Sequence, residues 1–140
     1  MKRRLAVVIL FALLSASSAK KFGRCELASI LTRNGIPKNK IADWICLATA
    51  ESSLNSRAIN RNKNGSKDYG IFQINNGYWC SPGRHNICRV ACSALQSDNI
   101  APSIKCAKKI YQRHGFDAWY GWKNKCRGKN LSSYVKGCRY

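Results

Sequence analysis

Acidic residues are scarce in this chain. It has 6 Asp and Glu against 25 Lys and Arg, which gives a formal net charge of +19 in 140 residues. This excess favours anionic partners and speeds encounter with them, so nucleic acid, anionic membranes and acidic cell-wall polymers are candidates. From residue 20 onward, however, the basic residues are scattered, with no run longer than a doublet and no nucleic-acid-binding signature. The sequence therefore predicts no specific nucleic-acid partner.

Long hydrophobic runs are nearly absent as well. The one clear run, LAVVILFALL, follows the basic start MKRR and precedes the small residues SASSA. It is too short for a membrane-spanning helix, which needs about 20 apolar residues, and the pattern is typical of a secretory signal peptide. Ser17 and Ala19 form the expected cleavage pair. We therefore expect a signal peptide over 1–19, one domain over 20–140, and a secreted, extracellular protein without a membrane span.

Cysteine, in contrast, is abundant after residue 19. An even number of Cys in a small secreted protein predicts disulfides, here four of them. Spacing alone leaves the pairing open. A zinc site is the alternative, with Cys80, His85, Cys88 and Cys92 as ligands, but an oxidising compartment disfavours free thiols. We therefore predict no metal and no cofactor. The eight cysteines are Cys25, Cys46, Cys80, Cys88, Cys92, Cys106, Cys126 and Cys138.

Hydrophobic periodicity predicts a mainly helical domain interrupted by one small antiparallel sheet, an α+β fold. Asn64-Gly65 is the strongest hairpin signal, and YGIFQIN at 69–75 is the best strand candidate because it is rich in aromatic and β-branched residues. The Cys-, Gly- and Pro-containing segment 76–93 should be irregular and stapled by disulfides. Apolar residues at helical spacing predict helices over 24–35, 38–52 and 97–115, and shorter helical pieces over 116–126 and 131–138.

Four of the six acids have a structural explanation from position alone. Glu26 and Asp43 fall in the first turns of predicted helices, Asp98 falls early in the third, and Asp117 is the expected N-cap of the piece over 116–126. Negative side chains are favoured at helix N-termini by the macrodipole and by unpaired backbone N–H groups.

Glu51 has no such explanation. It lies at the C-terminal end of its predicted helix, where the macrodipole disfavours a negative charge. It also follows Trp44 by seven residues and Ala48 by three, which puts it near the apolar stripe. A carboxyl group there is partly desolvated, which raises its pKa and makes it a candidate general acid. The alternative is a structural carboxylate that turns to solvent or pairs with Arg57.

Asp68 is the other unexplained acid. It follows the turn NRNKNGSK and opens the predicted strand among polar residues, and such hydrogen-bonding surroundings favour the charged form. The alternative is a turn-capping Asp. If the strand were regular, the Asp68 side chain would lie on the same face as those of Phe72 and Ile74. Alternation alone therefore does not predict that Asp68 faces a cleft.

Taken together, one carboxyl group in an apolar setting and one in a polar setting are typical of glycoside hydrolysis. Residues suited to polysaccharide binding surround the pair. Aromatic rings can stack on sugar faces, although core packing is the expected role of Trp122. The candidate hydrogen-bonding residues are Asn60, Asn62, Gln73 and Asn75, and the candidate stacking residues are Tyr78, Trp79 and Trp119.

The segments KKFGRCELA, DYGIFQIN, CSALQSDNIAPSIKCAKKI and AWYGWKNKCRG closely resemble chicken-type (c-type) lysozymes, glycoside hydrolase family 22, over the whole of 20–140. A short middle segment is closer to invertebrate members. The resemblance implies a helical lobe and a small β-lobe flanking a cleft. Glu51 would be the general acid/base, and Asp68 the nucleophile or the stabiliser of an oxocarbenium-like transition state. The implied pairing is Cys25–Cys138, Cys46–Cys126, Cys80–Cys92 and Cys88–Cys106.

For substrate binding, the resemblance implies that Trp119 packs against the catalytic Glu and that other positions line sugar subsites. Tyr78 stands where vertebrate members often carry Trp, which implies weaker stacking at an outer subsite. The shortened YQRHG segment lacks an acid that some relatives use at the far end of the cleft. The implied subsite residues are Asn62, Gln73, Asn75, Trp79 and Ala118.

The expected activity is cleavage, with retention, of the β-1,4 bond between N-acetylmuramic acid and N-acetylglucosamine in bacterial peptidoglycan. Related N-acetylglucosamine oligosaccharides and the anionic bacterial surface are the expected partners of a monomeric protein, with defence favoured over digestion because of the positive charge. Two alternatives differ in kind. A calcium-binding, lactalbumin-like regulator should carry clustered Asp after Cys92, where only Asp98 is found. A cationic membrane-active protein would act without catalysis.

Overall fold

The computed structural model describes residues 6–9 and 20–140. Most of the predicted signal peptide, including its cleavage pair, lies outside the described residues, so that segment stays a prediction. In the part of the chain that is described, no helix is both long and apolar enough to cross a bilayer.

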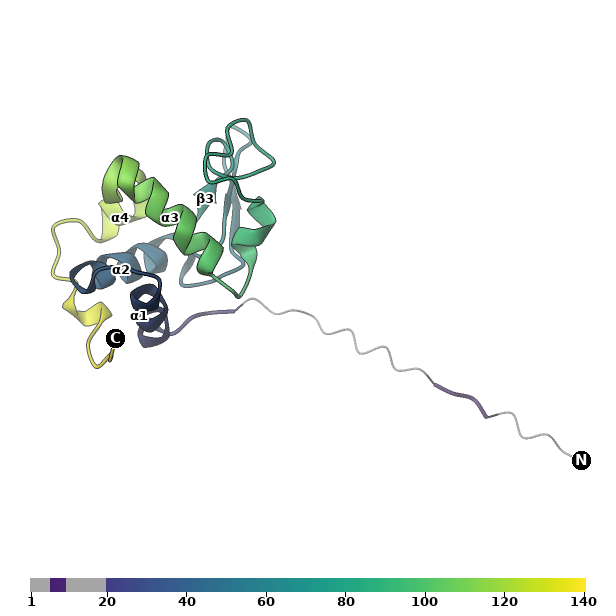
Figure 1. The fold of residues 1–140 in the computed structure, drawn as a ribbon, viewed down its shortest axis with the longest axis horizontal. Helices are drawn as coiled ribbons and strands as arrows, with labels where there is room; N and C mark the ends of the chain where they lie inside the picture. The colour runs from purple at the N-terminus through teal and green to yellow at the C-terminus, as the bar shows by residue number, and fades with distance from the viewer. Residues whose placement is uncertain (1–5, 10–19) are drawn as a thin grey trace, which may run out of the picture.

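Helices dominate the fold, and most of them lie where periodicity predicts (Figure 1). The third is shorter than predicted because residues 97–100 precede it, with Asn99 accepting a hydrogen bond from the Ala101 N–H and Pro102 in the first turn. The α-helices are α1 (Arg24–Arg33), α2 (Ile41–Ser52), α3 (Ala101–His114) and α4 (Tyr120–Lys125). The 3-10 helices are η1 (Lys38–Lys40), η2 (Cys92–Gln96), η3 (Gly115–Ala118) and η4 (Ser132–Tyr134).

Three short antiparallel strands form the sheet, in the order β1 (Ile59–Arg61), β2 (Lys67–Tyr69) and β3 (Ile74–Asn75). The predicted hairpin turn joins β1 to β2, with Gly65 at φ +86°, a conformation that favours glycine. The register pairs Asn60 with Asp68 and Asp68 with Asn75. Three polar side chains that the sequence singled out therefore stand in one row across the sheet. The α+β class is confirmed.

The prediction of one strand over 69–75 is wrong. β2 ends at Tyr69, residues 70–73 form a turn, and only Ile74 and Asn75 belong to β3. Gly70 causes the break: it has φ +77°, and a Cβ there would lie 1.8 Å from the Leu95 carbonyl oxygen. The apolar residues of the segment are instead buried in the turn, and the Ile71 carbonyl accepts a 2.7 Å hydrogen bond from the Ser52 hydroxyl at the end of α2.

Trp44 of α2 is the centre of the core. Its ring makes edge contacts with Phe72, Tyr111, Phe116 and Trp119, at centroid distances of 5.2–5.7 Å. These partners come from the β2–β3 turn, from α3, from η3 and from the start of α4. One buried ring thus joins the helices to the β-sheet region that carries Asp68.

We expect Trp44→Ala to destabilise the protein by about 3–5 kcal/mol, because it leaves a cavity among four aromatic partners. Chemical denaturation with the disulfides intact measures this change. Tyr120→Ala is the matched control, since Tyr120 is 73% exposed and its removal should change the free energy of unfolding by less than about 0.5 kcal/mol. Equal losses in the two variants would contradict the central role of Trp44.

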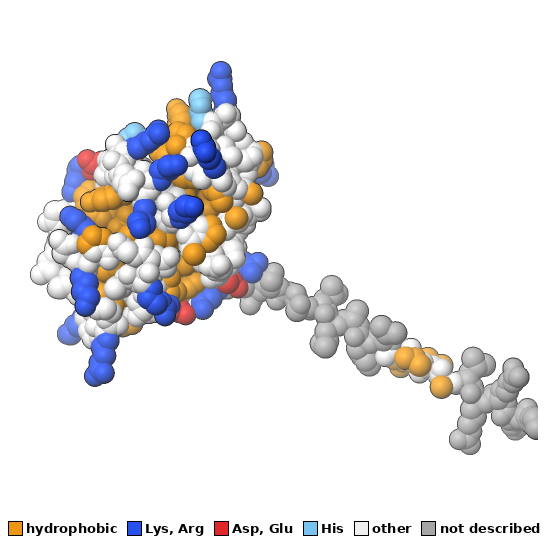
Figure 2. All heavy atoms as spheres, viewed as in Figure 1, with side chains coloured by type: hydrophobic (Ala, Val, Ile, Leu, Met, Phe, Trp, Pro, Cys, Tyr) orange, Lys and Arg blue, Asp and Glu red, His pale blue; other side chains and the backbone are white. Residues whose placement is uncertain are grey.

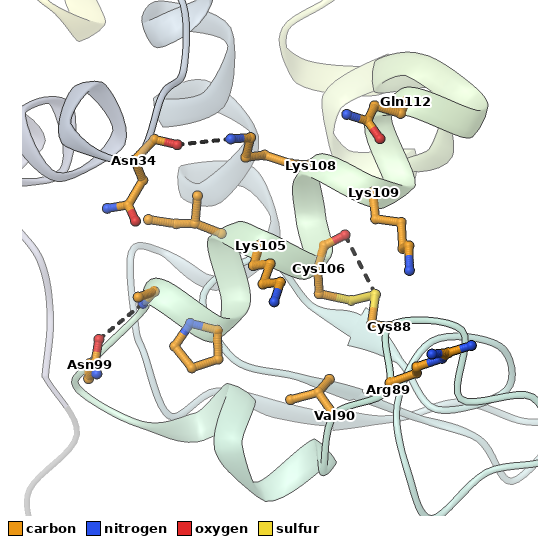
Figure 3. Close-up of a pocket in the computed structure, with 13 residues that line it drawn as sticks. Asn34, Cys88, Arg89, Val90, Asn99, Lys105, Cys106, Lys108, Lys109 and Gln112 are labelled. Atoms are coloured by element: carbon orange, nitrogen blue, oxygen red, sulfur yellow. Dashed lines mark hydrogen bonds between the residues drawn. A yellow bond between two sulfur atoms is a disulfide. The ribbon is translucent and has the colours of Figure 1, made fainter.

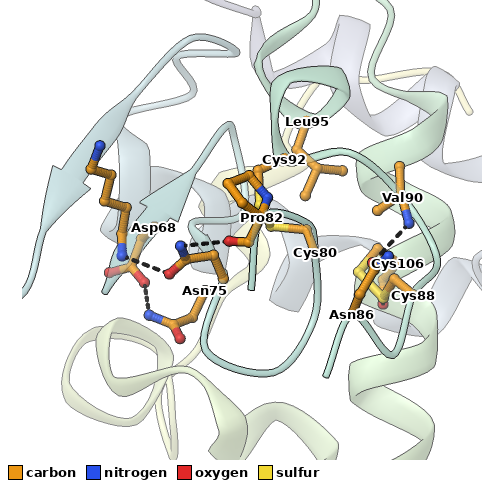
Figure 4. Close-up of a disulfide and its surroundings, with 12 residues drawn as sticks. Asp68, Asn75, Cys80, Pro82, Asn86, Cys88, Val90, Cys92, Leu95 and Cys106 are labelled. Atoms are coloured by element: carbon orange, nitrogen blue, oxygen red, sulfur yellow. Dashed lines mark hydrogen bonds between the residues drawn. A yellow bond between two sulfur atoms is a disulfide. The ribbon is translucent and has the colours of Figure 1, made fainter. Parts of the chain in front are cut away.

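Four disulfides hold the chain together, with the connectivity that the resemblance implies: Cys25–Cys138, Cys46–Cys126, Cys80–Cys92 and Cys88–Cys106. Figure 3 shows Cys88 and Cys106 beside α3, and Figure 4 shows the irregular middle segment around Cys80–Cys92 and Cys88–Cys106, near the sheet. Three of the four ligands of the alternative zinc site are used in these bonds, which rules that site out.

Two of the four structural carboxylates lie as predicted and two do not. Glu26 is in the first turn of α1, and Asp43 is in the first turn of α2. Asp98 lies before α3 instead of within it, and it accepts hydrogen bonds from the Ser56 hydroxyl and the Arg57 guanidinium. Asp117 lies inside η3 and forms an ion pair with Arg127, so it is not the N-cap of α4. Basic side chains are spread over the surface, as Figure 2 shows for one face.

Candidate active site

Glu51 lies in the last turn of α2, half-buried. Burial is the main cause that raises the pKa of its carboxyl group, and the negative charge of Asp68 adds to the effect. A 2.9 Å hydrogen bond from the Gly121 N–H to Oε1 opposes it. Arg57, the alternative partner, forms an ion pair with Asp98. The position at the end of α2 therefore favours a carboxyl group that keeps its proton to higher pH than an exposed Glu.

Gly121 is a site residue that the sequence did not single out. It is the second residue of α4, and a Cβ there would lie 2.7 Å from Glu51 Oε1 and 3.2 Å from the Ala50 Cβ. A side chain at this position would therefore push the carboxyl group aside. The glycine of WYGW, placed inside a helical pattern, is the signal that could have revealed it.

We expect Gly121→Ala to lower activity by about 10²-fold, the effect of a misplacement of about 1 Å at a reacting group. Alanine has a higher helix propensity than glycine, so the loss would come from the displaced carboxyl group and not from α4. Initial rates of hydrolysis of a soluble oligosaccharide measure it. Gly23→Ala is the control, because the nearest atom to its added Cβ would be 3.9 Å away. Unchanged rates in Gly121→Ala would contradict the assigned contact.

Asp68 lies in the middle of β2, and two side-chain amides hold its carboxylate. Asn75 Nδ2 donates to Oδ1 at 2.8 Å, and Asn62 Nδ2 donates to Oδ2 at 3.2 Å. Both amides also donate to the Ser66 hydroxyl, at 2.9 and 3.0 Å. Ser66, which the sequence did not single out, thus fixes the two donors. Because β2 ends at Tyr69, the alternation argument with Phe72 and Ile74 does not apply; the neighbour of Asp68 across the sheet is Asn75, visible in Figure 4.

A separate set of amide hydrogen bonds joins Asn60 of β1 to Gln73 of the β2–β3 turn. Asn60 Nδ2 donates to Gln73 Oε1 at 2.7 Å, and Gln73 Nε2 donates to the carbonyls of Gly70 and Ala58. Gln73 is only 8% exposed, whereas Asn60 is exposed. The Gln73 side chain therefore supports the β2–β3 turn, and Asn60 and Asn62 are the more accessible of the predicted hydrogen-bonding residues.

The aromatic candidates divide into buried and accessible rings. Trp119 is 5% exposed, and its Nε1 donates to the Phe72 carbonyl at 2.8 Å. Its ring is therefore buried and offers no accessible face on which a sugar could stack. Trp122 stacks on Phe116 and donates to Asp43, in keeping with the core role expected of it. Tyr78 is 59% exposed.

A cavity of about 540 Å³ brings together three of the predicted sugar-binding residues, Tyr78, Trp79 and Ala118. Both rings contact histidines: Tyr78 stacks on His85, which does not line the cavity, and Trp79 meets His114, which does, edge-on. The predicted Asn and Gln residues do not line this cavity; they surround Asp68 on the sheet. The remaining lining residues are Ile87, Arg113, His114 and Asp117.

Comparison with known proteins shows the family to which the chain belongs. A family model described as the C-type lysozyme/alpha-lactalbumin family matches residues 20–138. Lysozyme c-1 of Anopheles gambiae is 55% identical over 125 residues, which cover 89% of this chain and 89% of the relative. A lysozyme of Bombyx mori is 50% identical over 128 residues, covering 90% of this chain and 93% of the relative. Lysozyme C of Scophthalmus maximus is 47% identical over 138 residues, covering 94% and 96%.

The family model extends over nearly the whole described domain and spans the positions of Glu51 and Asp68. The relatives above carry lysozyme names, although the family description also includes alpha-lactalbumin. The chain therefore belongs to the C-type lysozyme/alpha-lactalbumin family, as a glycoside hydrolase of the lysozyme type.

Proposed function

We propose that this protein is a secreted muramidase that cleaves the β-1,4 bond between N-acetylmuramic acid and N-acetylglucosamine in bacterial peptidoglycan. The observation that carries the proposal is the contrast between its two carboxyl groups. Burial raises the pKa of Glu51, whereas the Asp68 carboxyl group accepts hydrogen bonds from the side-chain amides of Asn62 and Asn75. Such a contrast assigns acid and base roles to neighbouring carboxyl groups.

In the first step, Glu51 donates its proton to the glycosidic oxygen, and the bond from that oxygen to the anomeric carbon breaks. Asp68 attacks the anomeric carbon from the opposite face, or stabilises its positive charge, as the leaving sugar departs with the proton. In the second step, the Glu51 carboxylate takes a proton from water, and the water oxygen bonds to the anomeric carbon as Asp68 leaves. Two displacements restore the original configuration.

The cavity of Tyr78, Trp79 and Ala118 provides the stacking surface for sugars next to the cleaved bond, and Asn60 and Asn62 are accessible donors near Asp68. Trp119 and Gln73, both buried, support the carboxyl groups indirectly by packing and hydrogen bonding. The predicted signal peptide and the four disulfides fit a monomer that is exported to an oxidising compartment. Its positive charge favours binding to anionic cell walls. This charge favours defence over digestion.

The stereochemistry of the first product tests the mechanism. Proton NMR during early hydrolysis of soluble peptidoglycan fragments should show the β-anomer of N-acetylmuramic acid at the new reducing end before mutarotation. The release of reducing ends should follow the same time course. The α-anomer as first product would contradict a double displacement and would indicate a single attack by water.

We expect activity to fall as pH rises through the pKa of Glu51, because the donated proton is then lost. Burial raises that pKa above the usual value for Glu, so the alkaline limb should lie at higher pH than for an exposed carboxyl group. Initial rates on a soluble substrate at constant ionic strength measure this alkaline limb. A soluble substrate avoids the change in cell-wall charge that pH would cause. A rate that still rises above about pH 9 would contradict the role of Glu51 as acid.

A further inference from the structure

A second cavity, of about 770 Å³, lies along α3, and none of the predicted catalytic or sugar-binding residues lines it. Its volume is within the range of roughly 300–1,000 Å³ that is usual for small-ligand pockets. We call it the α3 groove. Its lining residues include Arg89, Val90, Pro102, Ile104, Lys105 and Lys109 (Figure 3).

The rim of the α3 groove is cationic. Lys105, Lys108 and Lys109 stand at i, i+3 and i+4 on α3, Arg89 also lines the groove, and none of the six acids of the chain does. Like charges at this helical spacing repel one another. Figure 2 shows basic side chains around hydrophobic surface on the face that α3 crosses in Figure 1. A bound anion would neutralise this unbalanced cluster.

Two of the four cations are committed and two are available. Lys108 Nζ donates to the Asn34 carbonyl at 3.0 Å, and Lys109 Nζ donates to the Ile87 carbonyl at 3.2 Å. Within residues 20–140, the Lys105 and Arg89 side chains make no hydrogen bond or ion pair. Both can therefore turn to an incoming anionic group without breaking an existing contact.

The floor of the α3 groove is apolar. Val90, Ala101, Pro102 and Ile104 line it together with the Cys88–Cys106 disulfide. Its length along α3, from Ala101 to Gln112, is about 16 Å at about 1.5 Å per residue. Figure 3 shows Arg89 and Lys109 toward one end, Asn99 toward the other and Lys105 between them. A purely polar polyanion would gain nothing from such a floor, whereas an alkyl chain would.

We propose that the α3 groove binds a single-chain amphiphile with a phosphate headgroup. The phosphate accepts charge-assisted hydrogen bonds from Arg89 and Lys105, and the alkyl chain covers Val90, Pro102 and Ile104. This site does not depend on the proposed muramidase activity, because none of its residues surrounds Glu51 or Asp68.

Titration of the protein with dodecyl phosphate, below the concentration at which it forms micelles, tests the site by calorimetry and amide NMR. We expect saturable one-to-one binding with shifts in 88–90 and 101–112. Octyl phosphate should bind more weakly, by up to about fourfold for each methylene removed. Inorganic phosphate that binds as tightly as dodecyl phosphate, or the lack of saturable binding by dodecyl phosphate, would overturn the proposal.

Lys105→Glu should weaken dodecyl phosphate binding by at least about tenfold, because it replaces a charge-assisted donor with a repulsive acceptor. Lys125→Glu makes the same change in net charge on the exposed end of α4, outside the groove, and should leave affinity nearly unchanged. Equal losses of affinity in both variants would mean that only the net charge of the protein matters, and would overturn the proposed site. Binding should also persist when N-acetylglucosamine oligomers saturate the cleft, and their displacement of the amphiphile would contradict a separate groove.

Discussion

Glu51→Gln should abolish nearly all hydrolysis, with a loss of about 10²–10⁴-fold in rate, the usual contribution of a general acid. The amide is close in shape to the carboxyl group and keeps an oxygen that can accept the Gly121 N–H hydrogen bond. Its nitrogen has no acidic proton to give to the glycosidic oxygen. Clearance of cell-wall turbidity and release of reducing ends should therefore fall together.

The stability of Glu51→Gln separates loss of chemistry from loss of fold. Burial raises the pKa of Glu51 in the folded protein, so the folded state binds the proton more tightly than the unfolded state. The ionised group therefore destabilises the fold once pH exceeds the folded pKa, and it has no such effect below the unfolded pKa. Glu51→Gln should have a thermal midpoint equal to or above that of the natural chain near neutral pH, with the difference vanishing in acid.

Glu26→Gln is the matched control for the same chemical change. The hydrogen bond from Lys20 is the main cause that lowers the pKa of Glu26, so its ionised form stabilises the fold above the unfolded pKa, and this stabilisation is lost as pH falls through the folded pKa. The exposed pair contributes at most about 1 kcal/mol, and activity should not change. Undiminished clearance by Glu51→Gln would remove the catalytic assignment and favour a membrane-active protein.

Local patterns in the sequence predict much of this fold. The apolar spacing that predicts α1 and α2 depends on neighbours within a few residues. The same is true of the hairpin at Asn64-Gly65. The Gly70 turn was missed because its cause is the carbonyl of Leu95, which is distant in sequence, and strand propensity takes no account of such contacts.

The candidate site shows the same division. Glu51 can be recognised from nearby residues, because a negative charge is unfavourable at the end of its helix and beside its apolar stripe. Gly121, whose N–H donates a hydrogen bond to Glu51, lies 70 residues later in the sequence. Asp98 was misplaced because its partners are Ser56 and Arg57 on a distant loop. The sequence does not reveal Ser66, because its hydroxyl accepts hydrogen bonds from Asn62 and Asn75 only when the strands are paired.

Asp68→Asn should lower the rate by about 10²–10³-fold, since it removes the negative charge that faces the developing positive charge on the sugar. Asp98→Asn is the matched control: it changes an acid that is paired with Arg57 before α3 and should leave the rate nearly unchanged. The thermal midpoint of Asp68→Asn should be checked as well, because one of the two donors, Asn62 or Asn75, would then face an amide nitrogen.

Rescue by azide distinguishes the roles of the two carboxyl groups. In Asp68→Ala, azide can occupy the space of the missing carboxylate and attack the anomeric carbon from that face, so the product should be the α-glycosyl azide. In Glu51→Ala, Asp68 remains, and azide arriving from the opposite face in the second step should give the β-product. The same anomer from both variants would mean that only one face of the sugar is open to attack. The two carboxyl groups would then not stand on opposite sides of the cleaved bond, and the double displacement through Asp68 would be wrong.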